Sequence, residues 1–214
     1  MALGRQLRIF VVALCVLVPT LCAGQSYDLL LKAVIRGDIA GVGALLDQGL
    51  DPNTADADGN SILMTAARLG YRDLTALLIK RKASVARRSP HGDTALMFAS
   101  LKGQLDIAKL LLENGAEISH GGWTPLHYAA FEGGPDLVKF LIEKGADRNG
   151  LAPNGFSPLM LAARSGQLEA ARVLLYEDAD LTVKGPKGET ALGIARERKN
   201  TELEALIRRA GAVE

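Results

Sequence analysis

The sequence predicts an all-α protein: a solenoid of about six stacked helix–turn–helix units joined by hairpin-like fingers. The first observation is a recurring anchor residue, spaced by 33, 33, 30, 33 and 33 residues, at Asp28, Ser61, Thr94, Thr124, Ser157 and Thr190. The second is that Leu follows every anchor by two positions and Ala by five, while Gly follows by nine positions in five of the six units. A fixed period of this length is typical of repeat proteins, whose units must stack because none can bury its apolar face alone.

The first helix of each unit is predicted to carry the recurring Leu and Ala. Leu and Ala at three-residue spacing lie on one helical face, and the small Ala allows a neighbouring helix to approach closely. The Gly at position nine suits a left-handed residue that ends this helix. Lys199 is the exception among the six units.

A second apolar helix is predicted in each unit, and it closes with Gly-Ala-Asp or a relative of it. Its apolar stretches include Leu45-Leu46, Leu77-Leu78-Ile79, Leu110-Leu111-Leu112, Phe140-Leu141-Ile142 and Val173-Leu174-Leu175. Turn-forming stretches such as Asp58-Gly59-Asn60 separate the units. The units are predicted at approximately 27–57, 58–90, 91–120, 121–153, 154–186 and 187–214, numbered one to six below. The spacing of 30 predicts a short finger ahead of unit four.

The two end units carry more polar residues than the inner ones. Asp28 and Lys32 stand in unit one, and Lys199, Asn200, Arg208 and Arg209 stand in unit six. We therefore expect polar outer faces at both ends, which would keep the stack soluble and finite.

The fourth unit resembles the ankyrin repeat closely, through Thr124-Pro125-Leu126-His127-Tyr128-Ala129-Ala130, Gly133 and Leu137 to Asp147. The resemblance covers residues 27 to 214 and implies an ankyrin-repeat solenoid. In this family the His and Thr hydrogen-bond the turn together. The other units carry Leu31, Met64, Met97, Met160 or Gly193 in place of the His. We therefore expect apolar turns in those units.

Residues 1–24 have the layout of a secretory signal peptide. Arg5 and Arg8 precede an apolar run from Ile9 to Val18, and Pro19 and small residues follow. The run is shorter than the roughly 20 residues that span a membrane. We expect export to the periplasm, with secretion or an uncleaved anchor as alternatives. Both cysteines lie in this segment, so the domain at 25–214 has no thiol and no disulfide.

Composition argues against several functional classes. The 25 Lys+Arg residues nearly balance the 24 Asp+Glu residues, which gives no reason to expect nucleic acid or, after signal cleavage, a membrane as partner. Three histidines without cysteine make a poor metal set, and the His-Gly-Gly-Trp stretch at 120–123 lacks a G-x-S-x-G partner. We expect no catalytic residue, no metal and no cofactor, and a monomer.

Binding to a protein is therefore the predicted function. In this architecture the variable positions are the residue before the anchor, on the finger, and positions seven and eight after it, on the concave side of the first helix. The candidate partner-binding residues at these positions are Arg68, Leu69, Leu101, Lys102, Trp123, Phe131, Glu132, Phe156 and Arg164. An apolar centre with a cationic rim is typical of a protein-binding hot spot.

Two questions stay open at this stage. Trp123 and Phe156 either bind the partner or pack on their own fingers. The resemblance extends to small exported bacterial ankyrin-repeat proteins, some of them linked to periplasmic oxidative-stress enzymes such as catalase. The functional classes are therefore a periplasmic interaction scaffold, an accessory factor for such an enzyme, and a secreted effector that binds a host protein.

Overall fold

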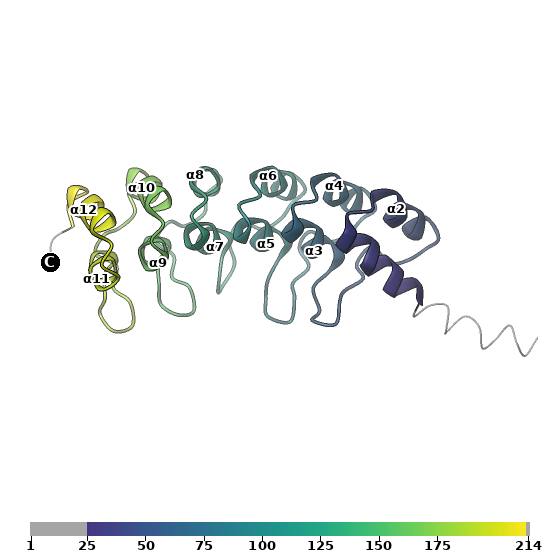
Figure 1. Cartoon of the computed structure of the whole chain (residues 1–214), viewed down its shortest axis with the longest axis horizontal. Helices are drawn as coiled ribbons and strands as arrows, with labels where there is room; N and C mark the ends of the chain where they lie inside the picture. The colour runs from purple at the N-terminus through teal and green to yellow at the C-terminus, as the bar shows by residue number, and fades with distance from the viewer. Residues whose placement is uncertain (1–24, 213–214) are drawn as a thin grey trace, which may run out of the picture.

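The computed structural model describes residues 25–212, and these form two rows of helices with fingers projecting from one side (Figure 1). The predicted signal peptide, residues 1–24, lies outside the described residues. Residues 25–36 are helical and start the inner row, which continues with α3 (Ile62–Leu69), α5 (Ala95–Leu101), α7 (Pro125–Glu132), α9 (Pro158–Ser165) and α11 (Ala191–Glu197). The outer row consists of α2 (Ile39–Asp47), α4 (Arg72–Lys80), α6 (Leu105–Glu113), α8 (Pro135–Glu143), α10 (Leu168–Tyr176) and α12 (Thr201–Arg209).

The anchor residues of units two to six stand at the starts of the inner helices, whereas Asp28 of unit one lies inside its helix. Each anchor side chain accepts a hydrogen bond from the backbone N–H three residues later, at Ser61, Thr94, Thr124, Ser157 and Thr190. Such a cap satisfies one of the four free N–H groups at a helix start. Proline occupies the first turn of α7 and α9, where its missing N–H costs nothing.

The turn of unit two corrects one expectation. The N–H of Thr124 donates to Nδ1 of His127 at 3.1 Å, and the N–H of Ser61 donates in the same way to Sδ of Met64 at 3.3 Å. A thioether is a weak acceptor. The turn of unit two is therefore hydrogen-bonded rather than purely apolar.

Glycine is favoured at the end of the inner helices for two reasons. The backbone there is left-handed in every unit, including unit six, where Lys199 has φ 57°. Space is the second cause, because a Cβ on Gly133 would lie 2.1 Å from Oε1 of Gln167 in the next unit. A second left-handed position recurs at the end of each outer helix, where Lys82 and Asp178 stand in place of the Gly found in the other units.

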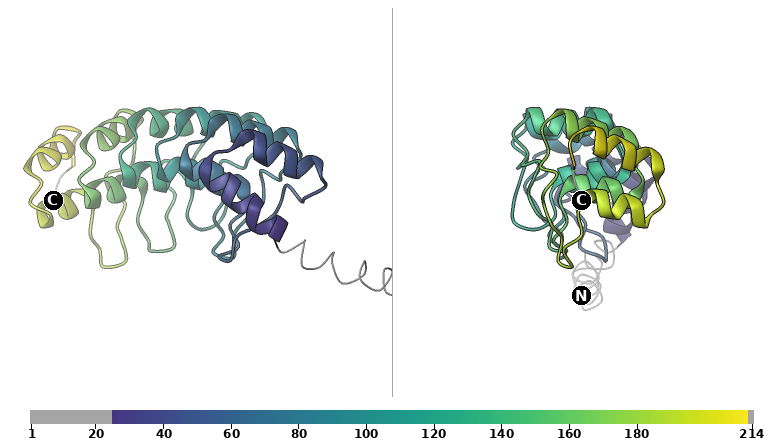
Figure 2. Two further views of the ribbon diagram at one scale, coloured as in Figure 1. Left: turned by 45° about the vertical axis from the view of Figure 1, so that its right-hand side comes forward. Right: turned by 90° about the vertical axis from the view of Figure 1, so that its left-hand side faces the viewer.

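The core lies between the two rows. The Leu two positions after each anchor is at most 3% exposed in all six units, and the Ala five positions after it is fully buried in units two to six. Consecutive inner helices pack on one another from α3 to α11. The helices arch with the fingers on the inner side of the arc, which we call the concave surface (Figure 2).

The fingers are tight turns with one exception. In the fingers ahead of α3, α5, α9 and α11, a backbone N–H donates to the carbonyl four residues later, as from Ser89 to Asp93 at 2.9 Å. The finger ahead of α7 is shorter (Figure 1), as the 30-residue spacing predicts. There, Nε2 of His120 lies 3.2 Å from Sδ of Met97 instead.

The two ends differ, so the expectation of a polar face at both ends is wrong for unit one. Leu29 is 56% exposed, although the equivalent Ile62 in unit two is fully buried. The described chain places no unit ahead of Leu29 to cover it. Unit six is polar as expected, since the carboxylate of Glu204 pairs with Arg196 at 2.9 Å and with Arg208 at 3.1 Å. These hydrogen bonds lower the pKa of Glu204.

Candidate functional site

The predicted partner-binding residues of the inner helices fall on neighbouring helix ends. Arg68 and Leu69 end α3, Leu101 and Lys102 end α5, Phe131 and Glu132 end α7, and Arg164 lies in the last turn of α9. Because α3, α5, α7 and α9 pack side by side, these residues form two adjacent rows across the concave surface. The stacking thus brings together residues that are about one unit apart in the sequence.

Exposed apolar side chains occupy the middle of these rows. Leu69 and Phe131 are each 40% exposed, while Leu101 is half-buried. A side-chain N–H of Gln167 donates to the carbonyl oxygen of Phe131 at 3.2 Å, which fixes the backbone beneath the exposed ring. Neighbouring exposed apolar side chains, when they form a contiguous patch, are a feature of binding surfaces.

Two arginines of the concave surface lie over aromatic rings. The guanidinium of Arg68 is 5.9 Å from the centre of the Phe98 ring, and that of Arg164 is 5.4 Å from the centre of the Phe156 ring. Such contacts hold an arginine by cation–π attraction. Phe98 was not among the predicted residues, since it lies four positions after its anchor, outside the variable positions.

Trp123 packs on its own unit. Its ring centre is 5.6 Å from that of Tyr128 and 5.9 Å from that of His127, with an edge-on geometry to the histidine. The Tyr128 hydroxyl donates to Oδ1 of Asp93 on the preceding finger at 3.0 Å. Burial, the Asp93 charge and this hydrogen bond raise the pKa of Tyr128 to about 12. Trp123 therefore covers a link between two fingers, and only part of its ring faces solvent.

His127 is buried at the base of this cluster. Its Nδ1 lies 2.8 Å from the Thr124 hydroxyl, and its Nε2 lies 2.9 Å from the carbonyl oxygen of Gly150 in the next finger. Burial lowers the pKa of His127, although the Gly150 contact and the Asp147 charge oppose the effect. The imidazole joins the start of α7 to the finger ahead of α9, which is a structural role.

Phe156 and Arg164 line a pocket of about 360 Å³ together with residues that the sequence analysis left out. The added residues come from α11 and its finger, namely Lys187, Glu189, Ile194, Glu197 and Arg198. Their repeat positions could have been read from the sequence. Their convergence on Arg164 depends on side-chain placement, which the repeat pattern does not give.

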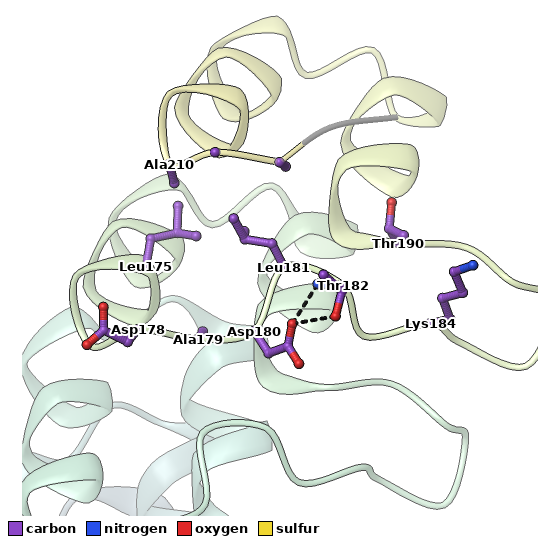
Figure 3. A pocket seen from close by; sticks show the side chains of 11 residues that line it. Leu175, Asp178, Ala179, Asp180, Leu181, Thr182, Lys184, Thr190 and Ala210 are labelled. Atoms are coloured by element: carbon purple, nitrogen blue, oxygen red, sulfur yellow. Dashed lines mark hydrogen bonds between the residues drawn. The ribbon is translucent and has the colours of Figure 1, made fainter.

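Two other hollows hold none of the predicted residues. One, of about 560 Å³, lies at the end of the stack beside Leu175, Leu181 and Ala210 (Figure 3). The carboxylate of Asp180 at its wall accepts from the Thr182 hydroxyl and backbone N–H, and these bonds lower its pKa. The other, about 310 Å³, lies between α6 and α8 around Phe140.

The concave surface of unit one contains a further apolar residue. Ile35 is 58% exposed at the position equivalent to Leu101 and Phe131, and its carbonyl accepts from the Tyr71 hydroxyl at 3.2 Å. Ile35 was not among the predicted residues, because the apolar residues at the variable positions concentrate in the middle units.

The described residues contain no cluster suited to a metal ion. Among residues 25–212, no three His, Cys, Asp or Glu side chains gather to hold a metal ion. Over the same range, none of the helices combines the length and the apolarity that crossing a membrane requires.

The family model for ankyrin repeats (three copies) matches residues 30–121 and 119–185. The chain belongs to the ankyrin-repeat family. Ankyrin repeats are generally protein–protein interaction modules, and their fold is typically non-enzymatic. The all-helical solenoid predicted from the sequence is thereby confirmed, and the crystal structure of the human ASB11 ankyrin repeat domain is similar to it, with a TM-score of 0.81 and 25% identity. That similarity covers 86% of this chain and 84% of the ASB11 chain.

Curated relatives match over shorter stretches. Serine/threonine-protein kinase 12 of Arabidopsis thaliana is 37% identical over 82 residues, which are 38% of this chain and 18% of the kinase. An ankyrin repeat-containing protein of Treponema pallidum is 36% identical over 88 residues, which are 41% of this chain and 30% of that protein. The chain thus spans less than a third of either relative, and the activity in the kinase's name is a statement about the kinase.

Proposed function

We propose that this ankyrin-repeat chain is a non-catalytic scaffold, exported to the periplasm, that binds a protein partner through its concave surface and fingers. The observation that carries the proposal is the exposure of Leu69 and Phe131, 40% each, on helices whose other aliphatic residues are buried. Neither side chain is needed to close the core, because unit five carries Arg164 at the position of Phe131 and Ser165 at the position of Leu69.

The charges around these apolar residues support a protein ligand. Arg36, Arg68, Lys102, Arg164 and Arg198 occupy positions seven and eight of their units, against two carboxylates, Glu132 and Glu197. An apolar centre with arginine around it matches the composition of binding hot spots. The surface is therefore suited to a partner segment that combines apolar and acidic side chains.

Periplasmic export is supported by the sequence of residues 1–24, with its basic start, apolar run and small residues. A bacterial relative in Treponema pallidum and the absence of cysteine from residues 25–214 agree with this location. We further propose that the protein acts there as a monomer, since neighbouring helices of both rows pack on one another within one chain.

Affinity capture from native periplasm tests the proposal. The full chain, tagged at its C-terminus, is compared with the double variant Leu101→Ser/Phe131→Ser and with Ile39→Ser/Tyr176→Ser, which changes two exposed apolar residues on outer helices. We expect one protein to be captured by the wild type and the control and reduced at least about tenfold with the concave-surface variant. Circular dichroism checks that all variants fold, and Phe131→Ser alone serves if the double variant does not.

Capture of the same proteins at the same level by all three baits would exclude the concave surface as the binding site.

A further inference from the structure

The pocket at the C-terminal end of the concave surface has a distinct chemical character. It measures about 360 Å³ and lies among α9, α11 and the finger ahead of α11. This volume falls at the lower end of the range for small-ligand sites, so the pocket suits one side chain of a larger partner.

The floor of the pocket is apolar and ordered. Ile194 is only 4% exposed, and Phe156 packs against the core. The guanidinium carbon of Arg164 lies over the Phe156 ring, 5.4 Å from its centre, and cation–π attraction favours this position. Arg164 is therefore held before any ligand arrives.

Positive charge exceeds negative charge around this floor. Arg164, Lys187 and Arg198 face Glu189 and Glu197. One carboxylate oxygen of Glu189 accepts from the backbone N–H of Lys187 at 2.8 Å, so it is already engaged within its own finger. Within residues 25–212 no ion pair joins any of these three cations to a carboxylate.

We propose that this pocket binds an Asp or Glu side chain of the partner protein. The proposal rests on the proposed function, since it assigns the partner's chemistry at one end of the same surface. A carboxylate can form paired hydrogen bonds with a guanidinium, and Arg164 and Arg198 both border the pocket. A basic side chain would meet three cations and one carboxylate that is free of internal hydrogen bonds.

The other hollows do not offer this arrangement. The larger one at the end of the stack contains Asp178 and Asp180 with a single cation, Lys184. In the hollow between α6 and α8, Lys109 and Lys144 both lie over the Phe140 ring, at 5.9 Å and 5.6 Å, on the outer row of helices. Of these three hollows in the described residues, the pocket at α9 and α11 is the one lined by predicted partner-binding residues, Phe156 and Arg164.

A random-peptide display selection tests this assignment, with the full chain immobilised through a C-terminal tag. We expect the enriched peptides to share an Asp or Glu at one position beside apolar residues. Replacing that acid by its amide in a synthetic peptide should weaken binding about tenfold. The variant Arg164→Gln/Arg198→Gln should abolish the acid preference. The matched control Arg72→Gln/Arg172→Gln removes the same amount of charge from outer helices and should retain the acid preference.

The outcomes separate this proposal from the broader one. Loss of peptide binding with Leu101→Ser/Phe131→Ser would support the scaffold function. If the same peptides show no preference for an acid, or if the preference persists with Arg164→Gln/Arg198→Gln, the pocket assignment is overturned while the scaffold function stands. Enrichment of Lys or Arg at the shared position would also overturn it. Failure to enrich any peptide would count against both proposals.

Discussion

Units four and five are linked by side-chain hydrogen bonds at both ends of the inner helix α7, one at the finger and one at the C-terminal end of the helix. Units three and four are linked in this way only at the finger end. In the first junction His127 reaches the carbonyl of Gly150, and Gln167 reaches the carbonyl of Phe131. In the second, Tyr128 reaches Asp93, but the residue equivalent to Gln167 is Gly134. A Cβ on Gly134 would lie 3.9 Å from the Cα of Gly103, so the two backbones face each other without a side chain between them.

The apolar core is the same at both junctions, with Leu and Ala buried in each unit. The difference shows that the repeated core sets the stacking and that polar side chains tune individual junctions. Core substitutions should therefore be severe wherever they fall, and polar substitutions should be local and smaller.

The largest effect is expected from a charge in the core. Ala162 is fully buried in α9, so Ala162→Asp should destabilise the stack by about 3–5 kcal/mol, because an unpaired carboxylate would be buried. The measurement is urea unfolding followed by circular dichroism. Ala205→Asp, at an exposed position of α12, is the control and should change little. An unchanged midpoint for Ala162→Asp would show that the assignment of the repeat positions is wrong.

Loss of His127 should weaken the junction between units four and five. His127→Ala removes the contacts to Thr124 and Gly150 and leaves a cavity, so the free energy of unfolding should fall by about 2 kcal/mol at pH 7.5. The same side chain should make stability depend on pH. Burial lowers its pKa in the folded state, so the unfolded chain takes up the proton more readily.

The stabilisation by His127 is therefore complete above about pH 6.5 and is lost as the pH falls through the folded pKa. Melting temperatures between pH 7.5 and 5 should fall less steeply for His127→Met, which adopts the residue that units two, three and five use at this position. His91→Met, on an exposed finger, controls for removing one histidine. Equal slopes for the wild type and His127→Met would exclude His127 as the titrating group.

A smaller effect is expected at the other junction. Tyr128→Phe removes the hydrogen bond to Asp93 and should cost about 1 kcal/mol. Because the pKa of Tyr128 is raised to about 12 in the folded state, its contribution is present below pH 10 and is lost as the pH rises through 12. Tyrosinate absorbance during an alkaline titration should show one late-ionising tyrosine, which should be absent from Tyr128→Phe.

The smallest effect would make the two junctions alike. Gly134 has φ −78°, which any side chain adopts, so Gly134→Gln should place an amide against the carbonyl of Leu101. We expect a gain of about 0.5 kcal/mol. Gly134→Ala separates the backbone contribution from the hydrogen bond. A gain no larger for Gln than for Ala, measured by urea unfolding, would show that the added amide makes no link.

The periodic features of the fold were predictable because each depends on residue type at a fixed spacing. The buried Leu and Ala and the left-handed residue at position nine both followed from the repeat. The turn of unit two and the exposed Leu29 did not. The first depends on the weak acceptor capacity of a Met sulfur, and the second on what lies ahead of unit one.

The candidate site was predictable only in part. The repeat placed Arg68, Leu101 and Phe131 on neighbouring helix ends, because equivalent positions must align in a stack. It could not choose between packing and binding for Trp123. That choice depends on ring contacts with Tyr128 and His127 beside a shortened finger.

The exposed Leu29 occupies a position that every later unit covers with the unit before it. Any sequence that presents a matching face could be added there without redesigning the core, since contacts in such a stack run only between neighbours. Duplication of a whole 33-residue segment would supply that face. The length of the array, and with it the length of ligand that it grips, is therefore free to evolve in whole units.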